Sequence, residues 1–261
     1  MPYISTDDIK IYYEVHGSGP PVLFLHGLGS STSGWKYQVS FFSKDYQVIL
    51  IDLRGHGNSG KPASTYSIEL FGRDCEIAIR SITDQPLDII GLSLGGFVAF
   101  QLALDYPSMV RSLTIVNSLP EFTISGPKNW TRLHLRLLIT RMLGVRSMAV
   151  LLSRQLFKGK EYDEIRKEFI EEWARNDKKA YLRTISALRR WSIAHQLEDL
   201  NSPVFMLASE LDYTSIKMKE YYAAKIPNCR LSVIKNTRHA LPVEKPDLFN
   251  LEVLNFIRSI S

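Results

Sequence analysis

A strand-like segment and a helix-like segment are joined by only a few residues in the first half of this chain. Residues 87–91 include Ile89 and Ile90, which are β-branched, and predict a strand buried on both faces. Residues 97–104 are mostly apolar and compatible with a helix. The residues between them contain Gly91-Leu92-Ser93-Leu94-Gly95. Ser93 is therefore expected at the tip of a sharp turn, with its hydroxyl at the carboxyl edge of a sheet.

The Gly-x-Ser-x-Gly pattern alone also fits an ordinary strand-to-helix turn, but in this context it is typical of a nucleophile elbow. A serine hydroxyl needs a base to take its proton and a carboxylate to orient that base. Asp212 follows an apolar segment at 203–208, and His239 follows another at 231–234. The order along the chain is Ser93, Asp212, His239, and all three are expected in loops at one sheet edge. Glu210 remains an alternative for the orienting carboxylate, with Asp212 then a turn or cap residue.

The remaining pattern predicts a parallel sheet covered by helices on both faces. Strands are expected at 9–15, 22–25, 47–51, 87–91, 112–116, 203–208 and 231–234, and helices at 35–43, 67–81 and 248–260. The pattern breaks between residues 120 and 200, where helices are expected near 129–142, 146–157, 161–176 and 179–193. We interpret residues 1–119 and 201–261 as the core, and residues 120–200 as a helical lid.

Composition narrows the class of protein. The chain has 261 residues, of which 45% are hydrophobic and 23% charged, and this favours one α/β domain with an insertion. No apolar run of about 18 residues and no secretory signal pattern is present, so we expect a cytoplasmic protein without a membrane span. Cys75 and Cys229 indicate neither a disulfide framework nor a metal site.

Positive charge is concentrated in the expected lid. The net charge is +5, and the segment 122–160 contains eight basic residues and no acidic one. Such a run is either a solvated helix face or a docking surface for an acidic partner. The candidate partner-binding residues are Lys128, Arg132, Arg136 and Arg141. A nucleic-acid partner is disfavoured because no recognisable binding module accompanies the charge.

Beyond the elbow, three further motifs resemble the α/β-hydrolase family. His26-Gly27-Leu28-Gly29 is similar to its oxyanion loop, residues 52–60 to its loop after the fourth strand, and Arg238-His239 with residues 244–249 to its histidine loop. One departure is Arg238, because glycine more often precedes the histidine in this family. Some relatives carry the acid after the preceding strand, where Asn117 and Ser118 stand in this chain.

The resemblance implies a fold, a mechanism and no cofactor or metal. The fold is α/β, a mostly parallel eight-stranded sheet covered by helices on both faces, with a helical lid after the sixth strand. Ser93 would be the nucleophile, His239 the general base, and Asp212 the orienting carboxylate. The backbone N–H groups of Leu28 and Leu94 would be the oxyanion donors. Residues 52–60 would be structural, although Arg54, His56 and Asn58 could also suggest a metal or phosphate site.

The expected function is cleavage of a carboxylic ester through an acyl-enzyme. An apolar acyl pocket is expected beneath the lid, lined by Trp35, Trp130, Leu137 and Leu138, with Leu133, Met142 and Leu151 as further lid candidates. These side chains could equally pack the lid on the core. The size and architecture resemble the esterases that demethylate pimeloyl-carrier-protein esters in the biotin pathway, so the candidate partners are a small-molecule ester and an acidic acyl carrier protein.

Other chemistries of the same fold remain open. A carbon–carbon bond hydrolase or lyase, a cofactor-free peroxidase-like enzyme and a non-catalytic small-molecule receptor are compatible with these motifs. Dehalogenase and epoxide-hydrolase chemistry is disfavoured, because the elbow holds serine rather than aspartate.

Overall fold

A mostly parallel sheet forms the centre of the protein. The computed structural model describes residues 2–122 and 126–260, with residues 126–129 described by their backbone only. Within these residues the sheet has eight strands in the order β1-β2-β4-β3-β5-β6-β7-β8. Its strands are β1 (Tyr3–Ser5), β2 (Lys10–His16), β3 (Pro21–Leu25), β4 (Gln47–Ile51), β5 (Leu87–Leu92), β6 (Val110–Val116), β7 (Val204–Ser209) and β8 (Cys229–Ile234). The β1–β2 and β2–β4 pairs are antiparallel and the other five pairs are parallel, which confirms the predicted fold.

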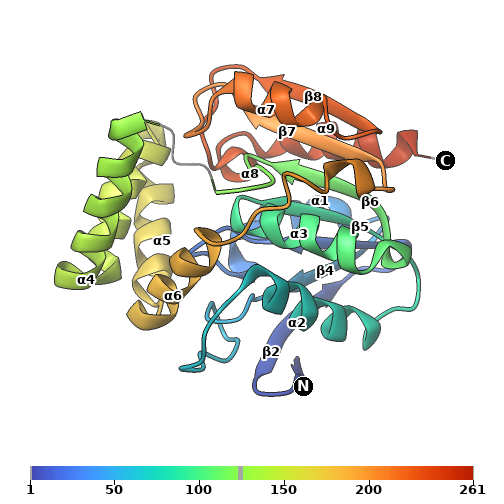
Figure 1. Cartoon of the computed structure of the whole chain (residues 1–261), viewed down its shortest axis with the longest axis horizontal. Helices are drawn as coiled ribbons and strands as arrows, with labels where there is room; N and C mark the ends of the chain where they lie inside the picture. Colours follow the sequence, from blue (N-terminus) through green and yellow to red (C-terminus); the bar gives the residue numbers. More distant parts are fainter. Residues whose placement is uncertain (1, 123–125, 261) are drawn as a thin grey trace.

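Helices cover both faces of the sheet, as predicted (Figure 1). One face carries α2 (Ile68–Arg80), α3 (Leu94–Asp105) and α7 (Ile216–Ala223), and the other carries α1 (Lys36–Phe42), α8 (Leu241–Glu244) and α9 (Pro246–Ser259). Strand β3 shows why two layers are needed. Leu23 and Leu25 pack into the first apolar cluster and Val22 and Phe24 into the second, and all four are fully buried.

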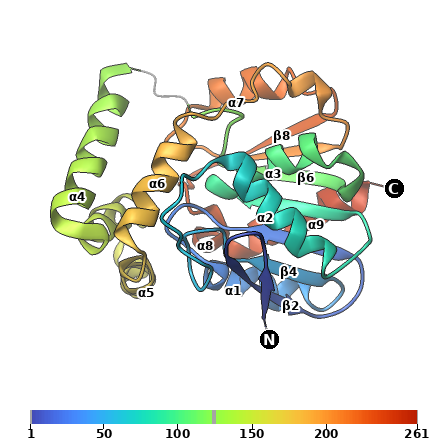
Figure 2. The same ribbon diagram turned by 60° about the horizontal axis from the view of Figure 1, so that its bottom comes forward.

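A helical insertion lies between β6 and β7, and we define it as helices α4 (Gly126–Leu156), α5 (Asp163–Ala174) and α6 (Lys178–Leu188). It packs around an apolar cluster of its own, which includes Leu137, Met148, Trp173 and Tyr181. Figures 1 and 2 both place it to one side of the sheet. The break expected between residues 142 and 146 falls at Gly144, whose φ of 84° is not helical. The helix expected at 179–193 is shorter in the structure, where α6 ends at Leu188.

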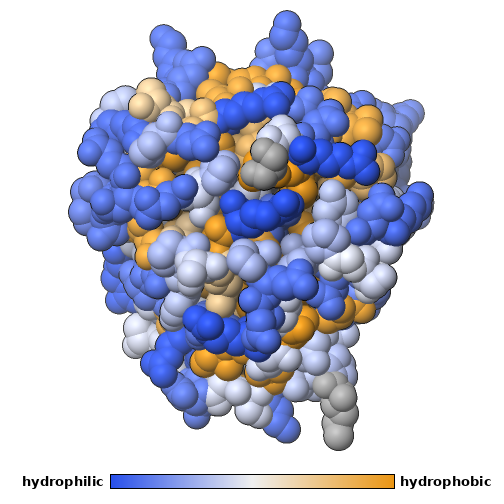
Figure 3. Space-filling model, turned by 90° about the vertical axis from the view of Figure 1, so that its right-hand side faces the viewer, coloured by the Kyte–Doolittle hydropathy of each residue, from blue (hydrophilic) through white to orange (hydrophobic). Residues whose placement is uncertain are grey.

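Four short 3₁₀ helices occur in the described connections, η1 (Thr32–Trp35), η2 (Pro107–Met109), η3 (Lys160–Tyr162) and η4 (Leu197–Asp199). On the face turned away from the helical insertion, hydrophilic side chains are spread over most of the surface, with hydrophobic ones between them (Figure 3). Across residues 2–122 and 126–260, no helix combines the length and the apolar character that a membrane span requires.

Candidate active site

Ser93 occupies a tight turn between β5 and α3, as the sequence predicts. Its φ of 53° is a left-handed conformation that residues other than glycine rarely adopt. The flanking positions 91 and 95 leave no room for a side chain, so both must be glycine. A Cβ on Gly91 would lie 2.3 Å from the carbonyl oxygen of Gly95, and one on Gly95 would lie 2.0 Å from that of Leu25. The Ser93 N–H donates to the carbonyl of Val116 at 3.0 Å, so the turn is fixed to the neighbouring strand.

Asp212 and His239 meet at the carboxyl ends of β7 and β8. His239 Nδ1 lies 2.6 Å from Asp212 Oδ1, and the Thr214 hydroxyl donates to Asp212 Oδ2 at 2.7 Å. Lys219 Nζ also donates to Asp212 Oδ2, at 2.6 Å. Burial alone would raise the pKa of Asp212, but the charges and hydrogen bonds of His239 and Lys219 hold this pKa well below its usual range. Asp212 is therefore an ionised carboxylate in contact with the imidazole.

The alternative orienting residue, Glu210, has a different role. Its carboxylate accepts a hydrogen bond from the backbone N–H of Asn236 at 2.8 Å, and the residue is exposed. The structure thus brings Asp212, rather than Glu210, to the histidine.

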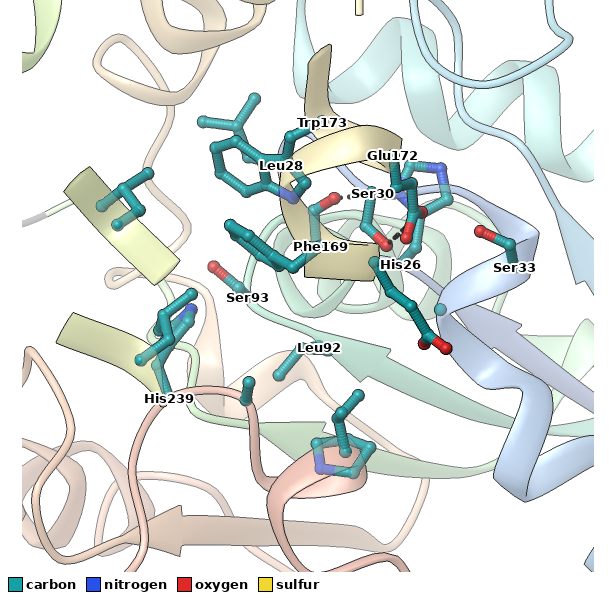
Figure 4. Close-up of a pocket in the computed structure, with 18 of the residues that line it drawn as sticks. His26, Leu28, Ser30, Ser33, Leu92, Ser93, Phe169, Glu172, Trp173 and His239 are labelled. Carbon is teal, nitrogen blue, oxygen red and sulfur yellow. Dashed lines mark hydrogen bonds between the residues drawn. The ribbon is translucent and has the colours of Figure 1, made fainter. Parts of the chain in front are cut away.

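Ser93 and His239 line the same two cavities, which have volumes of about 660 Å³ and about 360 Å³. Figure 4 shows both side chains in the larger one, below Leu28 and Phe169. No hydrogen bond joins the Ser93 hydroxyl to the imidazole in the part of the chain that the structure describes. Such bonds are often long before substrate binds and shorten in the complex.

Two backbone N–H groups lie beside the Ser93 turn without an acceptor among the described residues, those of Leu28 and Leu94. Leu94 is the first residue of α3, where a helix leaves its N–H groups unpaired. Leu28 belongs to the loop after β3, and a Cβ built on the preceding Gly27 would lie 3.7 Å from Ser93 Cβ. Gly29 permits the loop conformation because its φ is 83°.

Sequence analysis did not identify two residues that fix this arrangement. The side chain of Lys219 is only 1% exposed. It bonds Asp212 and also donates to Asn117 Oδ1 at 3.2 Å. Asn117 in turn donates to the carbonyl of His239 at 3.0 Å and accepts from the N–H of Ser209 at 2.8 Å. For Asn117 the sequence offered one signal, which is its position directly after β6 at the carboxyl edge of the sheet. For Lys219 on α7 the sequence gave no indication that the side chain is buried.

The loop at residues 52–60 is structural. Arg54 is 1% exposed and pairs with Asp8 and Asp74. Burial lowers the pKa of His26 to about 4 and that of His56 to about 3, so both rings are neutral at pH 7. His26 accepts from the N–H of Leu53 at 3.0 Å and contacts the carbonyl of Gly27. No cluster of three potential metal ligands is found among the described residues.

Arg238, the departure from the family pattern, is partly buried and paired with a carboxylate. Its guanidinium pairs with Glu244 at 3.1 Å, and Glu244 also accepts from the backbone N–H of Arg238 at 2.5 Å. Arg238 therefore links the histidine loop to α8 and does not add an unpaired positive charge to the site.

The expected pocket wall needs correction. Trp35 does line the larger cavity, and Leu133 and Leu151 line the smaller. Trp130 and Leu138 are 55% and 57% exposed, and neither lines either of these two cavities. The reason is the phase of α4, because one row of side chains packs inward and the row with these two faces outward. Two other expected residues are also placed differently: Leu137 is buried in the core of the helical insertion, and Met142 faces outward.

The candidate partner-binding residues differ in whether they face solvent or the cavities. Arg132 and Arg141 are exposed, and the side chain of Lys128 lies outside the described residues. Arg132 nevertheless also lines the smaller cavity, and half-buried Arg136 turns inward and lines both cavities. It donates through Nε to the Tyr181 hydroxyl at 2.9 Å, so it is not part of an outer docking face.

Comparison with known proteins is consistent with this geometry. A family model described as alpha/beta hydrolase fold matches residues 20–246, and the chain belongs to this family. "Putative carbamate hydrolase RutD" of Azorhizobium caulinodans is 26% identical over 100% of this chain and 99% of its own length. "3-oxoadipate enol-lactonase 2" of Acinetobacter baylyi is 24% identical, with 95% of this chain and 92% of the relative covered.

A solved N-acyl homoserine lactone degrading enzyme is 27% identical with a TM-score of 0.83, and the match covers 98% of this chain and 100% of that one. The family match and the names of the relatives make this protein a hydrolase of the α/β fold.

Proposed function

We propose that this protein is a serine hydrolase that cleaves a carboxylic ester, open or cyclic, through an acyl-enzyme. Ser93 is the nucleophile, His239 the general base and Asp212 the orienting carboxylate. The observation that carries the proposal is that a strained serine lines the same two cavities as a histidine whose Nδ1 contacts a buried carboxylate.

The geometry supports the following acylation step. His239 takes the Ser93 proton as Oγ attacks the substrate carbonyl, and Asp212 holds the imidazole in the tautomer that leaves Nε2 free to accept. Negative charge develops on the carbonyl oxygen. The N–H groups of Leu28 and Leu94 would donate to it, and removing one such donor from a serine hydrolase costs roughly 10²–10³ in kcat. The alcohol leaves with the proton from His239.

Deacylation repeats the same steps with water. His239 takes a proton from water, which attacks the acyl carbonyl, and the tetrahedral intermediate releases Ser93 with the proton returned to it. For a lactone, alcohol and acid stay in one molecule. Ester and lactone cleavage are supported together, because the relatives include an enol-lactonase and an N-acyl homoserine lactone degrading enzyme.

The test is turnover of p-nitrophenyl esters by Ser93→Ala. The variant should lose hydrolysis while keeping its circular dichroism spectrum and melting temperature. Ser33→Ala is the matched control, because Ser33 borders the same cavity but lies away from His239 (Figure 4), and it should remain active. Ester hydrolysis at near-normal rates by Ser93→Ala would remove the proposal.

A second proposal concerns the partner. The outer face of α4 combines exposed Arg141 with exposed Trp130, Leu138 and Met142, which supports docking of an acidic acyl carrier protein that presents an acyl methyl ester. The charge reversal Arg141→Glu should slow cleavage of methyl pimeloyl-carrier protein but not of a small methyl ester, because Arg141 lines neither cavity. Equal effects on both substrates, or no effect on either, would contradict docking.

A further inference from the structure

Arg136 brings a positive charge into the walls of both cavities. We propose that it forms a subsite for a carboxylate group of the substrate, an inference that rests on the proposed ester or lactone cleavage at Ser93. The preferred substrates are then esters or lactones that carry a second, ionised carboxyl group.

The side chain is held in one orientation. Its Nε and Nη2 both donate to the hydroxyl of Tyr181, a residue that is only 1% exposed. The guanidinium carbon also lies 5.5 Å from the ring centroid of Tyr181 and 5.9 Å from that of Trp173. Aromatic faces attract a cation without neutralising it. The group is therefore positioned before any ligand arrives, which lowers the entropy lost on binding.

Donors remain available on this guanidinium. Both N–H groups of Nη1 and one of Nη2 have no acceptor among residues 2–122 and 126–260, and Arg136 forms no ion pair there. A partly buried cation without a counter-charge is costly, and an ionised ligand would relieve that cost. A carboxylate fits best, because its two oxygens match two parallel N–H groups of a guanidinium.

The neighbouring carboxylates do not meet this demand, because each has donors of its own. On α5, which lines the larger cavity, Glu168 pairs with Lys36, Glu171 pairs with Arg146, and Glu172 accepts from the hydroxyls of Ser30 and Ser31. In the smaller cavity Glu121 accepts from Tyr222, and Asp212 is bound by His239 and Lys219.

The subsite lies next to the catalytic histidine. The ring of Tyr213 packs 4.5 Å from the imidazole of His239, centroid to centroid, and lines both cavities. Arg136 and Ser93 also line both cavities, so Arg136 can hold one end of a short substrate while Ser93 attacks the other.

The test compares two aryl esters of equal chain length, mono-p-nitrophenyl adipate and p-nitrophenyl hexanoate, which differ in a terminal carboxylate. The ratio of their kcat/KM values, adipate over hexanoate, should fall about ten- to hundredfold in Arg136→Gln, the range for losing hydrogen bonds to a charged group. Arg136→Lys keeps the charge without the planar fork and should retain part of the ratio. Arg154→Gln, an exposed change of equal charge on the same helix, should leave it intact.

A binding measurement separates this inference from the proposed function. Calorimetry with free adipate should show binding to Ser93→Ala and a large loss of affinity in Ser93→Ala/Arg136→Gln. If neither ester is hydrolysed but adipate binds in this Arg136-dependent way, the subsite stands and the esterase proposal fails. If hexanoate is hydrolysed but Arg136→Gln leaves the ratio unchanged, or lowers both rates equally, the subsite is refuted and the esterase proposal stands.

Discussion

Replacing Lys219 by methionine is expected to change both the stability and the pH dependence of this protein. Lys219 Nζ lies 2.6 Å from Asp212 Oδ2, and the two side chains are 1% and 0% exposed. Removing one partner of a buried ion pair costs about 3–5 kcal/mol, because the other charge stays buried. For a domain of this size each kcal/mol lowers the melting temperature by about 2–4 °C, so we expect a drop of about 6–20 °C.

The pH dependence distinguishes an electrostatic role from simple packing. Without the lysine, the negative charge of Asp212 acts on His239 undiminished and favours the protonated imidazole, which cannot act as a base. The acid limb of the kcat/KM profile should therefore move to higher pH, by roughly one unit.

Lys217→Met, an exposed change on the same helix, is the control and should alter neither quantity. An unchanged melting temperature together with an unmoved acid limb in Lys219→Met would show that this reasoning is wrong.

Three further outcomes are expected. Asp212→Asn should lower kcat on p-nitrophenyl esters by about 10⁴ with the fold retained by circular dichroism, since the imidazole loses its correct tautomer; a loss below tenfold would contradict the assigned role. Gly29→Ala should destabilise the protein by about 1–3 kcal/mol in urea titrations and reduce kcat, because φ is 83° and the new Cβ would lie 2.8 Å from Trp173 beside the Leu28 N–H; unchanged stability would argue against this packing. The pKa of Asp212 is lower in the folded protein than its unfolded value of about 3.9, so its contribution to stability is present above about pH 4 and is lost as the pH falls further. Urea titrations at pH 7 and pH 3 should thus show a larger loss for the wild type than for Asp212→Asn, and equal losses would contradict it.

Features set by local chain geometry could be predicted from the sequence. The backbone approaches so closely at residues 91 and 95 that only glycine fits there, and these two glycines identified the turn at Ser93. Buried strands followed by polar residues identified the loops of Asp212 and His239, because parallel strands all end at one sheet edge. The structure then joined these two residues by a 2.6 Å contact.

Features set by packing between distant elements could not be predicted. The sequence placed Arg136 with Arg132 on one helix face, but it could not show that this face borders the smaller cavity or that Arg136 contacts Tyr181 of α6. Trp130 was expected to face the pocket for its apolar character alone, yet it is exposed. Nothing in the sequence distinguishes Lys219 from a surface lysine, because its burial depends on how α7 packs against β7.

The central claim is tested most directly by covalent trapping at Ser93. The protein is treated with a fluorophosphonate at pH 7, digested, and its peptides are analysed by mass spectrometry. The account predicts one phosphonyl group on Ser93 in the wild type, and much slower labelling in His239→Ala, where no base takes the proton. A wild-type protein left unlabelled at Ser93, or labelled equally fast without His239, would contradict it.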